Sequence, residues 1–156
     1  MVTATDLPTD RLAIGQLLGR LLYYFRQDVL DVAGRHGYPD IRAPHLQIFG
    51  NVGINGIRLT DLATKAQLSL AATSEFVTEL EQLGYLERRP DPADGRAKLI
   101  FPTTRGRYAL DDAGDRVAEI EHAWAKLAGQ AEFNHACHTL QRVLDQLDAD
   151  PDTTNT

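Results

Sequence analysis

Hydroxyl, carboxylate and guanidinium side chains gather in two neighbouring stretches of the chain, residues 69–78 and 88–98. Within the first stretch, hydroxyl groups, a methyl group and one carboxylate are supplied by Ser69, Ala71, Thr73, Ser74, Glu75 and Thr78. Within the second stretch, the charged candidates are Arg88, Arg89, Asp94, Arg96 and Lys98. Such groups can hydrogen-bond to phosphate oxygens and base edges, and a methyl group can meet a thymine methyl. The two stretches together predict a nucleic-acid contact surface.

Residues 60–83 are predicted to form two helices joined by a tight turn, which would position the hydroxyl groups. Thr60 can cap the first helix, and apolar residues at helical spacing follow it. Ser69 is a natural N-cap for the second helix, and Gly84 suits the C′ position that ends it. The inward side of the second helix is predicted to consist of Leu70, Phe76, Val77, Leu80 and Leu83. Before these two helices we expect a short helix over residues 41–52 and a short strand over residues 57–59 that pairs with the wing.

A β-hairpin is predicted directly after these helices. Residues 85–89 have strand character, and residues 98–101 can pair with them. Between them lies PDPADGR, a run of turn formers tipped by Gly95 and Arg96. Two helices and a hairpin in this order make a winged helix-turn-helix, whose second helix lies in the DNA major groove while the hairpin reaches phosphate or the minor groove.

Without gaps, residues 60–106 resemble the MarR family of bacterial transcriptional regulators. The resemblance is carried by DLA in the first helix, S-x(4)-S-x-F-V-x-x-L-E in the second, and G-Y-L-E-R-R-P-D-P-x-D-G-R through the wing. A T-x-x-G element, Thr103 to Gly106, then opens the next helix. The resemblance implies that Arg96 enters the minor groove, oriented by Asp94. We expect Arg88 and Arg89 to serve the base of the strand, with one of them reaching phosphate or pairing with an acid near the hinge.

The second helix departs from the family pattern in its charge. Family members usually carry arginine at the position of Glu75 and often at that of Glu79. Here the helix holds three glutamates and no basic residue. We interpret Glu79 and Glu81 as facing solvent, away from DNA. Glu75 could accept from cytosine N4 or repel phosphate, and the residues leave both open.

Charge is distributed unevenly along the chain. The net charge is −6, yet residues 86–107 hold six basic residues against three acidic ones, so this segment is +3 and the remainder −9. An acidic body with a basic wing fits a protein that contacts phosphate through one edge. A hairpin whose charges are merely solvated has the same composition.

Long helices with apolar stripes are predicted on both sides of the winged helix-turn-helix region, which we assign to residues 41–106. We expect the flanking segments 9–36 and 107–147 to form a dimerisation region, and segments 1–8 and 148–156 to be disordered. A stripe of this length exceeds what one small core can cover, although a monomeric core is the alternative. A two-fold dimer would read a near-palindromic operator. The predicted fold class is therefore mainly α with a small β-wing.

Many relatives in the resembling family bind small aromatic or anionic effectors. In this chain the corresponding region would be lined by Tyr23, Tyr24, Phe25, His45 and Phe49. A set of tyrosine and histidine side chains suits a phenol or an aromatic carboxylate. Aromatic residues at helical spacing also occur as ordinary core, so the ligand role is one of two interpretations.

Signatures of an enzyme are missing from the sequence. It has no Gly-rich phosphate loop, nucleophile elbow or HExxH motif, so we expect no catalytic site. Cys137 is the single cysteine, which excludes an intrachain disulfide, and we expect it to be a buried small hydrophobe. His135 and His138 lie beside it, but zinc needs three or four ligands, so we expect no metal or cofactor.

No stretch resembles a transmembrane helix or a signal peptide, and a cytoplasmic location is the simplest interpretation. Our hypothesis is a homodimeric, sequence-specific DNA-binding regulator, a repressor that a small effector releases. The alternative is a winged-helix protein-interaction or dimerisation module whose DNA binding is weak or lost, and the acidic second helix favours it.

Overall fold

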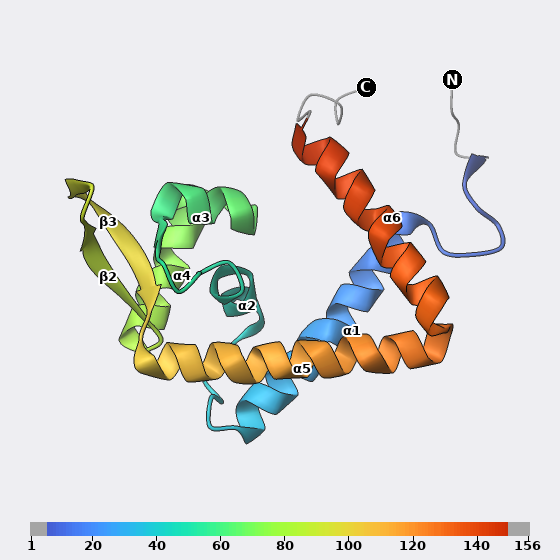
Figure 1. Ribbon diagram of the computed structural model, residues 1–156, viewed down its shortest axis with the longest axis horizontal. Coiled ribbons are helices and arrows are strands. Elements are labelled where there is room, and N and C mark those ends of the chain that lie inside the picture. The colour runs from blue at the N-terminus through green and yellow to red at the C-terminus, as the bar shows by residue number, and fades with distance from the viewer. Residues whose placement is uncertain (1–5, 150–156) are drawn as a thin grey trace. The chain divides into compact units, whose positions relative to one another are not determined.

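The computed structural model describes residues 6–149, and segments 1–5 and 150–156, which we expected to be disordered, lie outside them (Figure 1). The elements in chain order are α1 (Ile14–Arg35), α2 (Ala43–Phe49), β1 (Ile57–Arg58), α3 (Leu59–Ala66), α4 (Leu70–Gln82), β2 (Leu86–Asp91), β3 (Asp94–Pro102), α5 (Thr104–Ala128) and α6 (Gln130–Ala149). The predicted class, mainly α with a small β-wing, is confirmed. The chain divides within α5 into two compact units, residues 6–116 and 117–149.

The turn between α3 and α4 forms largely as its residues predict. Ser69 caps α4, and its Oγ accepts the Ala72 N–H at 3.1 Å. The helix ends before Gly84, whose φ of 82° is easy for glycine alone. The prediction that Thr60 caps α3 is wrong, because β1 runs directly into the helix and Arg58 occupies the N-cap position.

The core of the first unit lies where α2, α3, α4 and the sheet meet. Its fully buried apolar side chains are Ile48, Leu62, Val77, Leu80, Tyr85 and Ile100. Leu70 was predicted to belong to this core but is 51% exposed. It occupies the first position of α4, beyond the end of the core, although it points to the same side as Val77.

The three strands form an antiparallel sheet in the order β1-β3-β2, as the predicted third strand requires. Ile57 pairs with Ile100, and Arg89 pairs with Leu99. β2 and β3 extend as a narrow hairpin beside α3 and α4 (Figure 1). Both strands are longer than predicted, because Pro90 lies within β2 rather than in the turn. β2 is an edge strand, and edge strands are the place where a sheet tolerates proline.

The helices before the sheet differ from their predicted limits. α1 begins at Ile14, the first residue of its apolar stripe, instead of at residue 9. α2 covers residues 43–49 and is shorter than the predicted 41–52. Pro44 lies in its first turn, the one place where a helix tolerates proline.

The second unit consists of the end of α5 and the helix α6. Gly129, with φ at 96°, separates the two helices. α6 extends to Ala149, two residues into the segment expected to be disordered. Among residues 6–149, none of the helices is long and apolar enough to cross a membrane.

Candidate nucleic-acid interface

One face of α4 is polar and open to solvent. Ala71, Glu75, Thr78 and Gln82 are exposed, and their spacing of about one turn places them in a single row along the helix. The opposite side packs into the core. Because Ser69 caps the N-terminus of the helix, this row begins beside backbone N–H groups, which suit contact with an anion.

Thr73 does not belong to this exposed row, and the prediction that it contacts DNA is wrong. Its side chain is fully buried, and its Oγ1 donates to the Ser69 carbonyl oxygen at 2.8 Å. Thr78 makes the same type of bond to Ser74, at 2.9 Å, but remains exposed. Ser74 lies at the border of the exposed row and is half-buried.

The wing presents two cations to solvent. Arg96 and Lys98 are both exposed and lie two residues apart on β3, so they project from the same side of the strand. Among the residues that the structure describes, neither side chain makes an ion pair. Asp94 Oδ1 accepts the backbone N–H of Arg96 at 3.1 Å, so this carboxylate orients the backbone at the turn.

Arg88 and Arg89 are engaged within the wing and its neighbour α4. Arg88 Nη1 donates to Glu81 on α4. Arg89 donates to Glu87, with Nε at 3.0 Å, and its Cζ lies 4.5 Å from the centre of the Phe101 ring. Their guanidinium groups therefore hold the base of the wing, as the sequence led us to expect for this pair.

A third arginine, Arg58 on β1, fixes the far end of β2. Its Nη2 and Nε donate to Asp91 Oδ2 at 2.7 and 3.2 Å, while Asp91 Oδ1 accepts the N–H of Ala93 at 2.9 Å. The Ala93 N–H and the Arg58 guanidinium hold the pKa of the Asp91 carboxyl below its usual range. The turn of the wing is thereby tied to the edge strand on the opposite side of the sheet.

The glutamates of α4 differ from expectation in their surroundings. Glu79 and Glu81 were interpreted as facing solvent, but each is paired within the protein. Glu79 contacts Arg42 and His45 of the α2 region, and Glu81 contacts Arg88. The hydrogen bond from His45 lowers the pKa of Glu79, and Arg42 adds to this effect. In the described part of the chain, Glu75 makes no such pair.

The five residues suggested for an effector are not brought together. Tyr23 and Tyr24 are exposed on α1 at 61% and 59%, whereas His45 and Phe49 are buried. Phe49 lines a small cavity to which the other four do not contribute. The cavity measures about 20 Å³ and is formed by Val29, Val32, Ala33, Tyr38, Ile41, Leu46, Phe49, Ala109, Asp112 and Ala113. That is room for about one water molecule and not for an aromatic acid.

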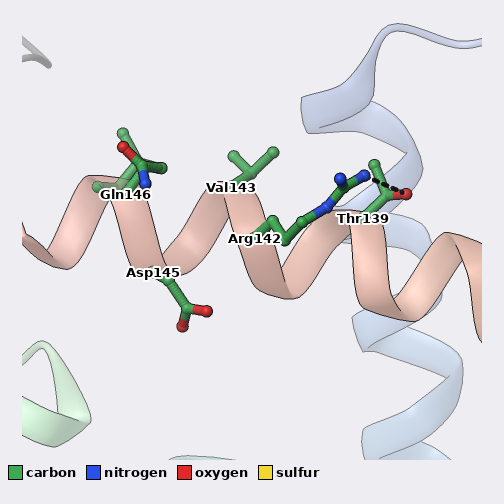
Figure 2. A pocket seen from close by; sticks show the side chains of 6 residues that line it. Thr139, Arg142, Val143, Asp145 and Gln146 are labelled. Atoms are coloured by element: carbon green, nitrogen blue, oxygen red, sulfur yellow. Dashed lines mark hydrogen bonds between the residues drawn. The ribbon is translucent and has the colours of Figure 1, made fainter.

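A surface hollow lies along α6 in the second unit (Figure 2). It is lined by Thr139, Arg142, Val143, Asp145, Gln146 and Leu147, all from this one helix. Arg142 Nη2 donates to Thr139 Oγ1 at 3.4 Å, and Val143 and Asp145 project to different sides of the helix (Figure 2). The described residues give it no walls that would enclose a ligand.

Cys137 is exposed on α6, so the expectation that it is buried is wrong. The reason is that α6 forms no buried core of its own among the described residues, so its middle turns remain open. In residues 6–149, no group of three or more histidine, cysteine, aspartate or glutamate side chains is arranged to hold a metal ion.

The sequence analysis did not predict several arginines that position the interface, because their partners are distant in the sequence. Arg42 and Arg58 act on partners 37 and 33 residues away. Arg105 on α5 donates to the Leu83 carbonyl oxygen at 2.7 Å and to the Tyr85 hydroxyl at 3.0 Å, so it joins the end of α4 to α5. Local periodicity does not report contacts between such distant residues.

Comparison with known proteins agrees with this geometry. The sequence profile of the MarR family matches residues 54–98. The chain is 28% identical over 87 residues to the HTH-type transcriptional regulator BilQ of Clostridioides difficile strain CD3, an alignment that covers 56% of this chain and 59% of that protein. The chain thus spans less than two thirds of the length of that relative.

Solved structures share the fold. CouR from Rhodococcus jostii RHA1, in complex with p-coumaroyl-CoA, is 27% identical, with a TM-score of 0.68 over 83% of this chain and 90% of that one. The complex of Staphylococcus aureus MepR with DNA is 19% identical, with a TM-score of 0.70 over 88% of this chain and 100% of that one. The second similarity shows the fold alone.

Proposed function

Because the winged-helix region of this chain belongs to the MarR family of transcriptional regulators, we propose that the chain binds a specific DNA sequence as a homodimer and represses transcription. Members of this family are regulators and not enzymes, as the sequence predicted. The observation that supports the proposal is one juxtaposition. The capped helix α4 has an open polar face, and beside it the wing carries two cations, Arg96 and Lys98, that make no ion pair within residues 6–149.

The two parts of this surface would contribute different kinds of contact. Arg96 and Lys98 supply phosphate or minor-groove contacts, which give affinity at any sequence. On α4, Ala71, Glu75 and Thr78 offer a methyl group, a carboxylate and a hydroxyl group to base edges in the major groove. The MepR–DNA complex, which shares the fold, is consistent with a role in DNA binding.

Dimerisation is supported by apolar side chains that the described chain leaves uncovered. On α1, positions 14, 17, 18, 21 and 22 are exposed apolar residues at helical spacing. On α6, the same spacing recurs at Leu140, Val143, Leu144 and Leu147, each more than 40% exposed. A second copy of the chain would cover these stripes and set two recognition helices about one DNA turn apart, on a near-palindromic operator.

An effector would release the DNA by favouring a dimer geometry in which the two α4 helices no longer match the half-sites. Such a shift requires the effector to bind one geometry more tightly than the other. CouR binds p-coumaroyl-CoA, an aromatic acyl thioester, so aromatic acids and their thioesters are the compounds to screen.

The alternative function is a winged-helix module for protein interaction that has lost DNA binding. Its support was the acidic second helix. Since Glu79 and Glu81 are paired internally, that helix exposes fewer free carboxylates than its sequence indicates. The structure therefore favours the regulator.

The experiment that tests the proposal is DNA binding across salt concentrations. The protein is titrated with a duplex of the DNA upstream of its own gene and with duplexes that it selects from a random pool. Arg96→Ala should weaken binding to every sequence and reduce the slope of log affinity against log salt by about 1. Arg89→Ala is the control, since it removes the same charge from a guanidinium engaged by Glu87, and it should keep the slope. If the protein selects no duplex, even at low salt, the proposal that it is a sequence-specific DNA-binding regulator is refuted.

A further inference from the structure

Glu75 lies on the open face of α4 that would meet DNA, and Glu79 lies at the border of that face. Glu75 and Glu79 are four residues apart, so both project from neighbouring turns of the same side of the helix. Two unpaired carboxylates in a row would repel each other and the phosphates of the major groove. Only one of these two carboxylates is unpaired among the described residues, because His45 and Arg42 both bind the carboxylate of Glu79.

His45 is buried, with only 1% of its surface exposed, and both of its ring nitrogens are engaged. The backbone N–H of Arg42 donates to Nδ1 at 3.1 Å, so Nδ1 acts as the acceptor and the proton of the neutral ring lies on Nε2. Nε2 then donates to Glu79 Oε2 at 2.8 Å. The start of α2 thereby fixes the tautomer that points an N–H at α4.

The guanidinium of Arg42 donates to the same oxygen of Glu79. The Phe76 ring packs edge-on against His45, with ring centres 6.2 Å apart, and keeps the imidazole in place. The Glu79 side chain remains 32% exposed, at the border between the open face of α4 and the core. Its carboxylate is therefore held toward α2 by two donors, although its position on the helix would allow it to reach the open face.

We propose that Arg42 and His45 are positioning residues for the recognition helix α4. They hold the Glu79 carboxylate against α2 and away from DNA, so that Glu75 is the single carboxylate that α4 presents to the major groove. This inference rests on the proposed function, because it concerns how the same surface meets DNA.

The first test is a double-mutant cycle between Arg42 and Glu79, read out as affinity for the duplex selected by the wild-type protein. Arg42→Gln should weaken binding about tenfold at low salt, because the Glu79 charge is no longer balanced. Glu79→Gln should bind as tightly as wild type or more tightly. Arg42→Gln combined with Glu79→Gln should bind like Glu79→Gln alone.

A direct contact between Arg42 and phosphate gives a different result. Arg42→Gln would then weaken binding equally with or without the Glu79 carboxylate, and the salt slope would fall by about 1 in both backgrounds. That result would overturn the positioning role. The Arg42 side chain is 58% exposed, so these variants are expected to fold.

The second test separates the two bonds of His45 with a matched pair of neutral variants. In His45→Gln, the amide nitrogen can occupy the place of Nε2 and still donate to Glu79. In His45→Asn, the amide oxygen can replace Nδ1 and accept the Arg42 N–H, but the side chain does not reach Glu79. His45→Gln should retain the wild-type affinity, and His45→Asn should lose affinity as Arg42→Gln does.

A purely structural role for His45 would lower the melting temperature of both variants and leave the affinity of the folded protein unchanged. That outcome, measured with affinities corrected for the folded fraction, would overturn this inference and leave the proposed function standing. Failure of the wild-type protein to bind any selected duplex would instead refute the proposed function, and with it this inference.

Discussion

The backbone of Gly106 lies directly against the carbonyl group of Tyr85. A Cβ atom at position 106 would be 2.1 Å from the Tyr85 carbonyl oxygen, closer than any side chain permits. Thr103 holds the two segments together, since its N–H donates to the same carbonyl at 3.0 Å and its Oγ1 accepts the Gly106 N–H at 3.0 Å. The T-x-x-G element is thus the junction at which α5 starts against the wing.

Gly106→Ala should destabilise the protein by about 3 kcal/mol, because the added methyl group forces the helix away from β2. The matched control is Gly114→Ala on the same helix, where an added Cβ meets nothing within 4 Å. That variant should be more stable by about 1 kcal/mol, as expected for a glycine in an open helix interior. Urea unfolding of both variants measures the difference, and equal midpoints would contradict the close approach.

Local signals were sufficient to predict most of the winged helix. Ser69 and Gly84 mark the ends of α4 because capping depends on the residues of the helix end itself. The strand pairing followed from turn formers between two apolar runs. The length of the strands did not, because Pro90 is tolerated on an edge strand and the sequence alone does not tell an edge from a centre.

The candidate site was less predictable because its contacts join distant residues. The bond from His45 to Glu79 spans 34 positions and the bond from Arg58 to Asp91 spans 33. From the sequence of α4 alone, Glu79 was therefore predicted to face solvent, although its partner His45 lies on α2. Thr73 was predicted to be exposed for a related reason. Packing against the core decides which side of α4 is buried, and Thr73 lies on that side.

The ion pair between Asp91 and Arg58 should make stability depend on pH. The Ala93 N–H and the Arg58 guanidinium lower the pKa of Asp91, so these contacts of its carboxylate stabilise the fold above the ordinary carboxyl pKa of 3.8. This stabilisation is lost as the pH falls through the lower pKa of the folded state. Asp91→Asn keeps an acceptor for the Ala93 N–H but removes the charge, so it should lower the urea midpoint at neutral pH.

The difference between wild type and Asp91→Asn should therefore shrink to nothing in strong acid. Asp94→Asn is the control, because Asp94 is exposed and accepts the backbone N–H of Arg96. It should change the midpoint little at neutral pH. A difference for Asp91→Asn that stays constant from neutral to strongly acidic pH would show that the charge of Asp91 does not stabilise the wing.

Glu75 should determine base preference at one position of each half-site. It is exposed on α4 and makes no ion pair with the described residues, so its carboxylate is available to accept from cytosine N4. Glutamine can instead form two hydrogen bonds with adenine. Selection from a random duplex pool should therefore recover cytosine at that position with the wild-type protein and adenine with Glu75→Gln.

Glu79→Gln makes the same chemical change one turn further along α4 and serves as the control. Because Arg42 and His45 already hold Glu79, that substitution should leave the selected sequence unchanged. The affinity of Glu75→Gln for its own selected duplex should show a salt slope like that of wild type, since no phosphate contact is lost. If both variants select the wild-type sequence, then Glu75 does not contact a base, and the major-groove contacts of α4 would come from the other exposed side chains of its open face, Ala71, Thr78 and Gln82.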